Sequence, residues 1–173
     1  FNSERLAYIP EYFSSYLDKS KLPNFTLLVS RNNQIAHLSS QGLASVEDKT
    51  QLSYDSIYRI FSMTKPITST AIMMLYERGL LRLEHEVSRY LPEFKNIKVW
   101  DGGDVENYSV RDPSQPILIR DLLIHTSGMT YGFMLGHPVI KLYNTSGLAS
   151  AKNPKTKEEM GLDEFSNIAS SLP

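Results

Sequence analysis

The segment from Thr64 to Gly79 constrains the fold of this chain more than any other stretch of its sequence. Its apolar residues recur at helical spacing, and further apolar positions widen the stripe until a helix there is apolar nearly all round. Pro66 lacks an N–H group and fits only in the first turn of a helix, while Gly79 suits a left-handed residue just after its end. We therefore expect a helix that begins near Thr64, ends before Gly79 and is central and buried.

The composition is that of a globular protein. Of the 173 residues, 41% are hydrophobic and 21% are charged, which suits one ordinary domain or parts of two. A net charge of -1 supplies no basic field for nucleic acid or anionic lipid, so we expect neither as a partner. No apolar run approaches the roughly 18 residues of a membrane span. We expect a soluble protein, and the sequence leaves open whether it is cytoplasmic, periplasmic or secreted.

The first forty residues predict a helix followed by a β-hairpin. Residues 3–20 have the apolar spacing of an amphipathic helix, although Pro10 should bend it or restart it. Asn32 and Asn33 tolerate positive φ and lie between two strand-like runs, which is the pattern of a hairpin turn.

Later segments give weaker signals. Residues 56–61 form a short extended segment that leads to the central helix, and residues 101–116 have the Gly, Pro and Asp content of a polar loop. A short helix should stop at Gly128, and one more helix should open at Asp163 after a stretch of weak periodicity.

Ser62 lies three residues before Lys65, where the extended segment gives way to the helix. Positions three apart share a helix face, so Ser62 Oγ and Lys65 Nζ can lie within hydrogen-bond reach. A lysine amine acts as a base only after losing its proton, and burial among apolar neighbours favours that form. The N-terminus of a helix also favours an alkoxide or an acyl oxyanion. The pair is therefore a candidate nucleophile and base.

A structural role for the same residues is the alternative. A Ser-x-x-Lys match alone is weak, because about one is expected by chance in a chain of this length. Ser62 or Thr64 can simply cap the helix while Lys65 lies in solvent.

Two longer stretches carry a family resemblance. Residues 60–94 read IFSMTKPITSTAIMMLYERGLLRLEHEVSRYLPEF, and residues 117–129 read ILIRDLLIHTSGM. The combination of Ser-Met-Thr-Lys, Gly-Leu-Leu-x-Leu, Tyr-Leu-Pro and Leu-Leu-x-His-Thr-Ser-Gly resembles the serine β-lactamase-related proteins of the class C type. That family includes class C β-lactamases, family VIII carboxylesterases, D-aminopeptidases and D-Ala-D-Ala carboxypeptidases. The resemblance runs from about residue 22 to about residue 132.

This resemblance implies a fold and a chemistry. The fold is α+β and β-lactamase/transpeptidase-like, with an antiparallel sheet flanked by helices and an inserted helical region. Residues 1–61 should be the N-terminal part of the sheet domain, and residues 62–173 an incomplete helical region that begins with the nucleophile helix. The implied enzyme is a serine hydrolase in which Ser62 is acylated by an ester, a β-lactam or a D-amino-acid peptide, and Lys65 takes its proton. No cofactor or metal is implied.

The sequence also departs from the family pattern. Neither the Tyr-x-Asn or Tyr-x-Ser motif nor the Lys/His-x-Gly strand follows the His-Thr-Ser-Gly segment. We therefore expect an N-terminal portion of a longer protein, inactive on its own. A catalytically inactive binding or scaffold domain of the same fold is the alternative function, and the oligomeric state is left open.

Structural roles are expected for the other candidate residues. His125 and Ser127 lie in a helix-ending turn without the Gly-x-Ser-x-Gly elbow. Tyr131 can face a substrate cleft, but packing at a cleft rim is the commoner role of such a tyrosine. The remaining histidines lack metal-ligand spacing, and the methionines near the central helix fit core packing better than a cofactor site. These residues are His37, His85 and His137, and Met63, Met73 and Met74.

Overall fold

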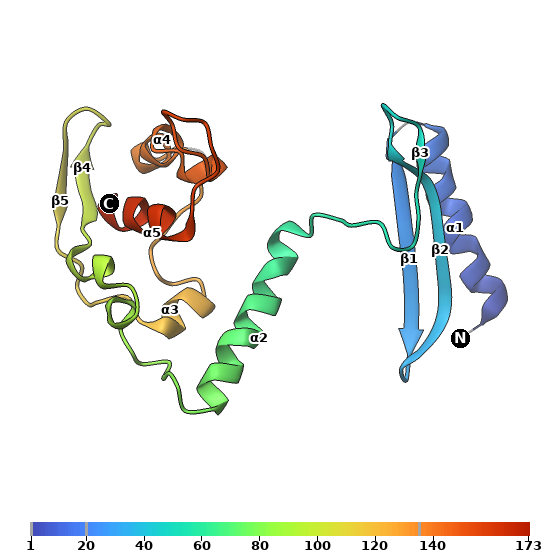
Figure 1. Ribbon diagram of the computed structural model, residues 1–173, viewed down its shortest axis with the longest axis horizontal. Helices are drawn as coiled ribbons and strands as arrows, with labels where there is room; N and C mark the ends of the chain where they lie inside the picture. Colours follow the sequence, from blue (N-terminus) through green and yellow to red (C-terminus); the bar gives the residue numbers. More distant parts are fainter. Residues whose placement is uncertain (1, 20, 135) are drawn as a thin grey trace. The chain divides into compact units, whose positions relative to one another are not determined.

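The computed structural model describes residues 2–19, 21–134 and 136–173 (Figure 1). The chain divides into two compact units, Phe1–Phe61 and Ser62–Pro173. Every strand pair in the described residues is antiparallel, and each unit combines helices with its own small sheet. The expected α+β class is confirmed.

The first unit is a β-hairpin with a helix beside it (Figure 1). Its elements follow in the order α1 (Ser3–Asp18), β1 (Asn24–Arg31), β2 (Gln34–Ser45) and β3 (Thr50–Gln51). The predicted N-terminal helix is confirmed, and α1 is continuous through Pro10 rather than restarting there. Ser20, the last residue of the predicted helix, lies outside the described residues. The ring of Phe13 on α1 lies 5.6 Å from the ring of the buried Phe25, which joins helix to sheet.

The hairpin turn is the one that the two asparagines predict. Asn32 and Asn33 have φ values of 51° and 59°, and Arg31 pairs with Gln34 on either side of them. Two consecutive left-handed residues define the type I′ turn, whose twist matches that of the flanking strands. The turn therefore sets the register of β1 against β2.

The extended segment predicted at residues 56–61 is not a strand. Residues 56–60 have no regular structure, and residue 61 already begins the 3-10 turn η1 (Phe61–Met63). An extended segment becomes a strand only where a neighbour satisfies its backbone groups, and no described strand pairs with this one.

Substitution of Asn33 tests the turn. Asn33→Ala should lower the free energy of unfolding by about 1 kcal/mol, because alanine has a Cβ that disfavours the left-handed region and no side chain to offset it. Asn33→Gly should be neutral or stabilising, since glycine enters that region freely. Urea denaturation of the full-length protein checks both variants. Gln34→Ala, at the next exposed residue with ordinary φ, is the control, and an equal loss there would contradict the assignment.

The second unit begins with the turn that carries Ser62 and with helix α2, and it continues through short elements around a small core. The elements are α2 (Thr64–Glu77), η2 (Val87–Arg89), η3 (Pro92–Asn96), β4 (Val99–Gly103), β5 (Tyr108–Arg111), α3 (Ile119–Leu123), α4 (Pro138–Thr145), η4 (Leu148–Ser150) and α5 (Leu162–Ser171). The core comprises Val139, Tyr143, Leu148 and Ala169, with Phe94, Trp100, Ile168 and Leu172 packed against them.

Helix α2 has the predicted bounds but not the predicted burial. It starts at Thr64 and is followed by Gly79 at φ 71°, as its sequence indicates. No residue of α2 is buried, and Ile67 is 62% exposed. The expectation of a central, buried helix is therefore wrong for the described residues, because no other element of this unit packs extensively over its apolar surface.

A hairpin replaces the polar loop predicted for residues 101–116. Strands β4 and β5 pair across residues 99–111, and the rings of Trp100 and Tyr108 stack with centroids 5.0 Å apart. Asp104 closes the turn by accepting hydrogen bonds from the backbone N–H groups of Glu106 and Asn107. The prediction failed because Asp and Gly, which usually mark loops, here form a turn and a bulged strand between two aromatic residues.

Two helix predictions need smaller corrections. α3 ends at Leu123 rather than at Gly128, because His125 already turns left-handed at φ 61°. α5 is confirmed but begins at Leu162, one residue before the predicted opening at Asp163. Among residues 2–19, 21–134 and 136–173, no helix combines the length and apolar character of a membrane span.

Candidate active site

Ser62 lies in the single turn of 3-10 helix that leads into α2. The residue at the cap position of α2 is Met63, and no side chain hydrogen-bonds to the cap there. The reading in which Ser62 or Thr64 merely caps the helix is therefore wrong. Pro66 falls in the first turn, where its missing N–H costs nothing. The first N–H groups of α2 thus have no side-chain acceptor of their own.

Lys65 meets Ser62 directly. Lys65 Nζ donates a hydrogen bond to Ser62 Oγ over 3.1 Å, the contact that the three-residue spacing predicts. The Lys65 residue is half-buried, but its neighbours Met63 and Ile67 are exposed. These two neighbours therefore do not desolvate Lys65 as the sequence led us to expect, and its role as a base stays a prediction.

Tyr131 is the site residue that the sequence interpretation underrated. Its ring lies 5.3 Å from Lys65 Nζ in a cation–π contact. At an exposed position such a contact stabilises by about 0.5–1 kcal/mol and restrains the lysine side chain. The sequence feature that could have identified Tyr131 is its position three residues after Gly128, directly after the turn of the family motif.

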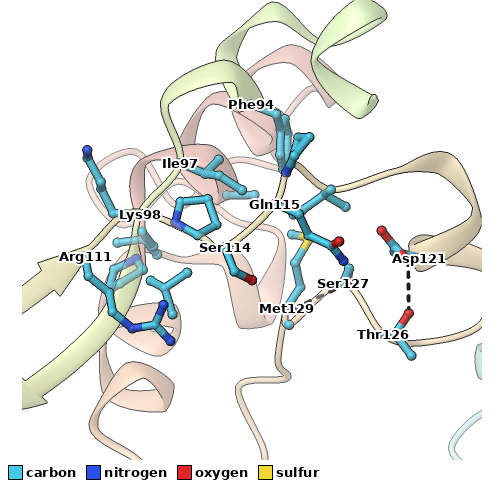
Figure 2. Close-up of a pocket in the computed structure, with 18 of the residues that line it drawn as sticks. Phe94, Ile97, Lys98, Arg111, Ser114, Gln115, Asp121, Thr126, Ser127 and Met129 are labelled. Carbon is cyan, nitrogen blue, oxygen red and sulfur yellow. Dashed lines mark hydrogen bonds between the residues drawn. The ribbon is translucent and has the colours of Figure 1, made fainter. Parts of the chain in front are cut away.

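The segment that carries Tyr131 is held at its start by Asp121. This carboxylate is only 8% exposed, and it accepts hydrogen bonds from Leu118 N over 2.9 Å and from the Thr126 hydroxyl over 3.3 Å. The backbone N–H of Thr126 also donates to the Asp121 carbonyl oxygen. These contacts join α3 to the turn that follows it, in which His125 is left-handed, into one corner. Figure 2 shows the hydrogen bond between Asp121 and Thr126.

Helix α4 holds the same segment further along. Asn144 Nδ2 donates to the carbonyl oxygen of Gly132 over 2.8 Å. The neighbouring Tyr143 forms a hydrogen bond with the backbone of Thr130, and burial raises the pKa of the Tyr143 hydroxyl while that bond opposes the rise. Residues 130 and 132 are therefore both attached to α4.

A cavity of about 250 Å³ lies behind this corner, and Figure 2 shows its lining. Its walls come from β4, β5, the His-Thr-Ser-Gly turn and α5, and they include Lys98, Arg111, Ser127 and Met129. Ser62 and Lys65 are not among the lining residues. The cavity therefore borders the segment that supports the candidate site and not the Ser62–Lys65 pair itself.

The remaining histidines have separate local partners. His37 Nε2 is hydrogen-bonded to Ser39 Oγ, His85 Nδ1 to the Tyr90 hydroxyl, and His137 Nδ1 accepts from Val139 N at the start of α4. Within the part of the chain that the structure describes, no three His, Asp or Glu side chains gather as ligands for a metal ion.

The sequence model of the beta-lactamase family matches residues 9–158. This chain belongs to the beta-lactamase family. The matched range contains the Ser62–Lys65 pair, the Asp121 corner and Tyr131. The β-lactamase/transpeptidase-like fold expected from the resemblance is confirmed.

Curated relatives of this beta-lactamase family member include enzymes of two kinds. Esterase EstB from Burkholderia gladioli is 34% identical over 72% of this chain and 29% of its own length. The ML-236A carboxylate methylbutanoyltransferase mlcH from Penicillium citrinum is 31% identical over 87% of this chain and 36% of its own length. The chain therefore spans about a third of the length of these relatives.

A solved structure extends the comparison. Unliganded simvastatin synthase LovD from Aspergillus terreus superposes with a TM-score of 0.68 at 25% identity. The superposition covers 94% of this chain and 46% of that protein.

Removal of the Asp121 carboxylate tests the corner. Asp121→Ala should lower the free energy of unfolding by about 3 kcal/mol, because it leaves a buried N–H and a hydroxyl without their charged acceptor. Asp112→Ala is the control, since that side chain is 82% exposed and forms only a surface ion pair with Lys98. Its loss should cost less than about 1 kcal/mol. Equal losses in urea denaturation of the full-length variants would refute the structural role of Asp121.

Proposed function

We propose that the protein containing this chain is a serine enzyme that transfers acyl groups, with Ser62 as the nucleophile and Lys65 as its base. The observation that carries the proposal is the 3.1 Å contact between Lys65 Nζ and Ser62 Oγ at the start of α2. Family membership and relatives named as an esterase and an acyltransferase support the same reaction class.

The reaction follows from the positions of these groups. Ser62 Oγ attacks the carbonyl carbon of the substrate while its proton passes to a neutral Lys65 amine. The resulting oxyanion lies near the first N–H groups of α2, which have no side-chain acceptor, and one donor is the backbone N–H of Ser62 itself. Lys65 then returns the proton to the departing alcohol or amine, leaving an acyl group on Ser62.

The second half of the reaction repeats the first with a new acceptor. Water, or an alcohol in an acyltransferase, attacks the acyl carbon, and Lys65 takes the acceptor's proton and restores it to Ser62 Oγ. Esters, β-lactams and D-amino-acid peptides all fit this scheme. The contact between Lys65 and Ser62 gives no support to the alternative of an inactive binding or scaffold domain.

Covalent labelling tests the nucleophile. A fluorophosphonate probe applied to the full-length protein should label only the peptide that carries Ser62, because no other serine of this chain is expected to have a lysine base beside it. Ser62→Ala should abolish the label and lower hydrolysis of p-nitrophenyl butyrate by about a thousandfold or more. Ser69→Ala, on the same helix, is the matched control and should retain both. Labelling of another serine, or unchanged hydrolysis in Ser62→Ala, would show that the proposal is wrong.

A lysine-to-arginine exchange tests the base. Lys65→Arg keeps the positive charge, but a guanidinium group does not release its proton in a protein. The rate of acylation should therefore fall by about a hundredfold or more. Lys141→Arg, on α4, controls for general effects of the exchange. Stopped-flow measurement of the p-nitrophenol burst checks the step, and a burst rate near that of the unmodified enzyme would exclude Lys65 as the base.

A further inference from the structure

A pair of stacked aromatic rings begins beside the candidate nucleophile. The rings of Tyr131 and Phe133 lie with their centroids 4.8 Å apart and their planes at 26°. The Tyr131 ring is also the one that lies 5.3 Å from Lys65 Nζ, the atom that hydrogen-bonds to Ser62 Oγ. The stack therefore extends outward from the reacting pair.

Both rings are open to contact from outside. Tyr131 is 44% exposed and Phe133 is 76% exposed. Many apolar side chains of this chain are exposed, so exposure alone does not mark a site. The stack is distinguished by its direct contact with Lys65, which ties an apolar surface to a specific chemical group.

The backbone that carries the rings is attached to α4. Residues 130 and 132 are attached to Tyr143 and Asn144 of α4. A Cβ atom at Gly132 would lie 2.2 Å from the Cβ of Ala149, so the backbone there is pressed against its neighbour. Residues 131 and 133 carry the stacked rings. The segment that carries the Tyr131–Phe133 stack, called the platform below, is thus attached to the rest of the unit.

The platform is apolar and uncharged. The segment from Thr126 to Met134 contains no Asp, Glu, Lys or Arg. The same segment contains two further exposed apolar side chains, Met129 and Met134, and methionine adapts readily to ligands of different shape. The segment that carries the stack therefore offers no charged side chain to a ligand, whereas its rings offer an apolar surface to a hydrocarbon chain.

We propose that the Tyr131–Phe133 stack binds the hydrocarbon chain of the substrate's acyl group, so that the enzyme prefers medium-chain esters to acetyl esters. This inference rests on the proposed role of Ser62. The acyl group is the part of the substrate that stays bonded to Ser62 Oγ through both half-reactions, and it needs a surface next to that atom throughout. Tyr131 and Phe133 are accordingly specificity-determining residues.

The test compares p-nitrophenyl hexanoate with p-nitrophenyl acetate in the full-length enzyme. The ratio of their kcat/KM values should favour hexanoate in the unmodified protein and fall by about tenfold in Phe133→Ala, because burial of the extra methylenes is lost. Phe133→Leu should retain most of the ratio, since it keeps an apolar surface. Tyr108→Ala is the control, because it removes one ring of the Trp100–Tyr108 stack, and it should leave the ratio unchanged.

The outcomes separate this inference from the function on which it rests. A preference for acetate in the unmodified enzyme, or an unchanged ratio in Phe133→Ala, would overturn the acyl-chain role even if Ser62 is labelled as proposed. A fall in melting temperature without a change in ratio would also overturn it, because the rings would then pack inside the protein. Failure of Ser62→Ala to abolish hydrolysis would instead count against the proposed nucleophile.

Discussion

The buried carboxylate of Asp121 holds together the part of the second unit that supports the candidate site. Its side chain links the residue just before α3 to the turn just after α3. The backbone at the start of α3 also forms hydrogen bonds with the segment that follows α2. A charged group this far from water is stable only when its oxygens accept hydrogen bonds, so its partners have little freedom to move. The position of Tyr131 depends on this corner and on the attachments to α4.

The start of α2 is the second constraint. Phe61 has a φ of 45°, an unusual conformation for a residue with a large side chain, and it immediately precedes Ser62. Backbone strain of this kind costs about 1 kcal/mol or more and tends to occur at functional positions. The helix that follows is left without a side-chain cap. Strain before the serine and open N–H groups after it are features that a purely structural helix start would avoid.

Much of the fold was accessible from local sequence rules. The Asn32–Asn33 turn, the bounds of α2 and the contact between Ser62 and Lys65 follow from backbone preferences and helical spacing, which act over a few residues. The β4–β5 hairpin was missed because the Trp100–Tyr108 stack that supports it joins positions separated by a turn. Helix α4 went unpredicted because it is only eight residues long and its start is set by the His137 side chain, which accepts a hydrogen bond from Val139 N.

The same limit explains what was missed at the site. The relation of Tyr131 to Lys65 spans most of the second unit, and no spacing rule connects two residues so far apart. The prediction that α2 is buried was wrong for a related reason. The sequence of an apolar helix shows that the helix needs a covering surface, but it does not show which segment supplies that surface.

The attachment of residues 130–133 has a consequence for how such a site can change over time. The contacts that hold this segment are made by its backbone, whereas the stacked rings next to the candidate nucleophile are the side chains of positions 131 and 133. Substitutions at the two ring positions therefore leave the supporting hydrogen bonds intact. Evolution, or a focused mutant library, can vary the shape of this surface in small steps while the Ser62–Lys65 pair keeps its own geometry.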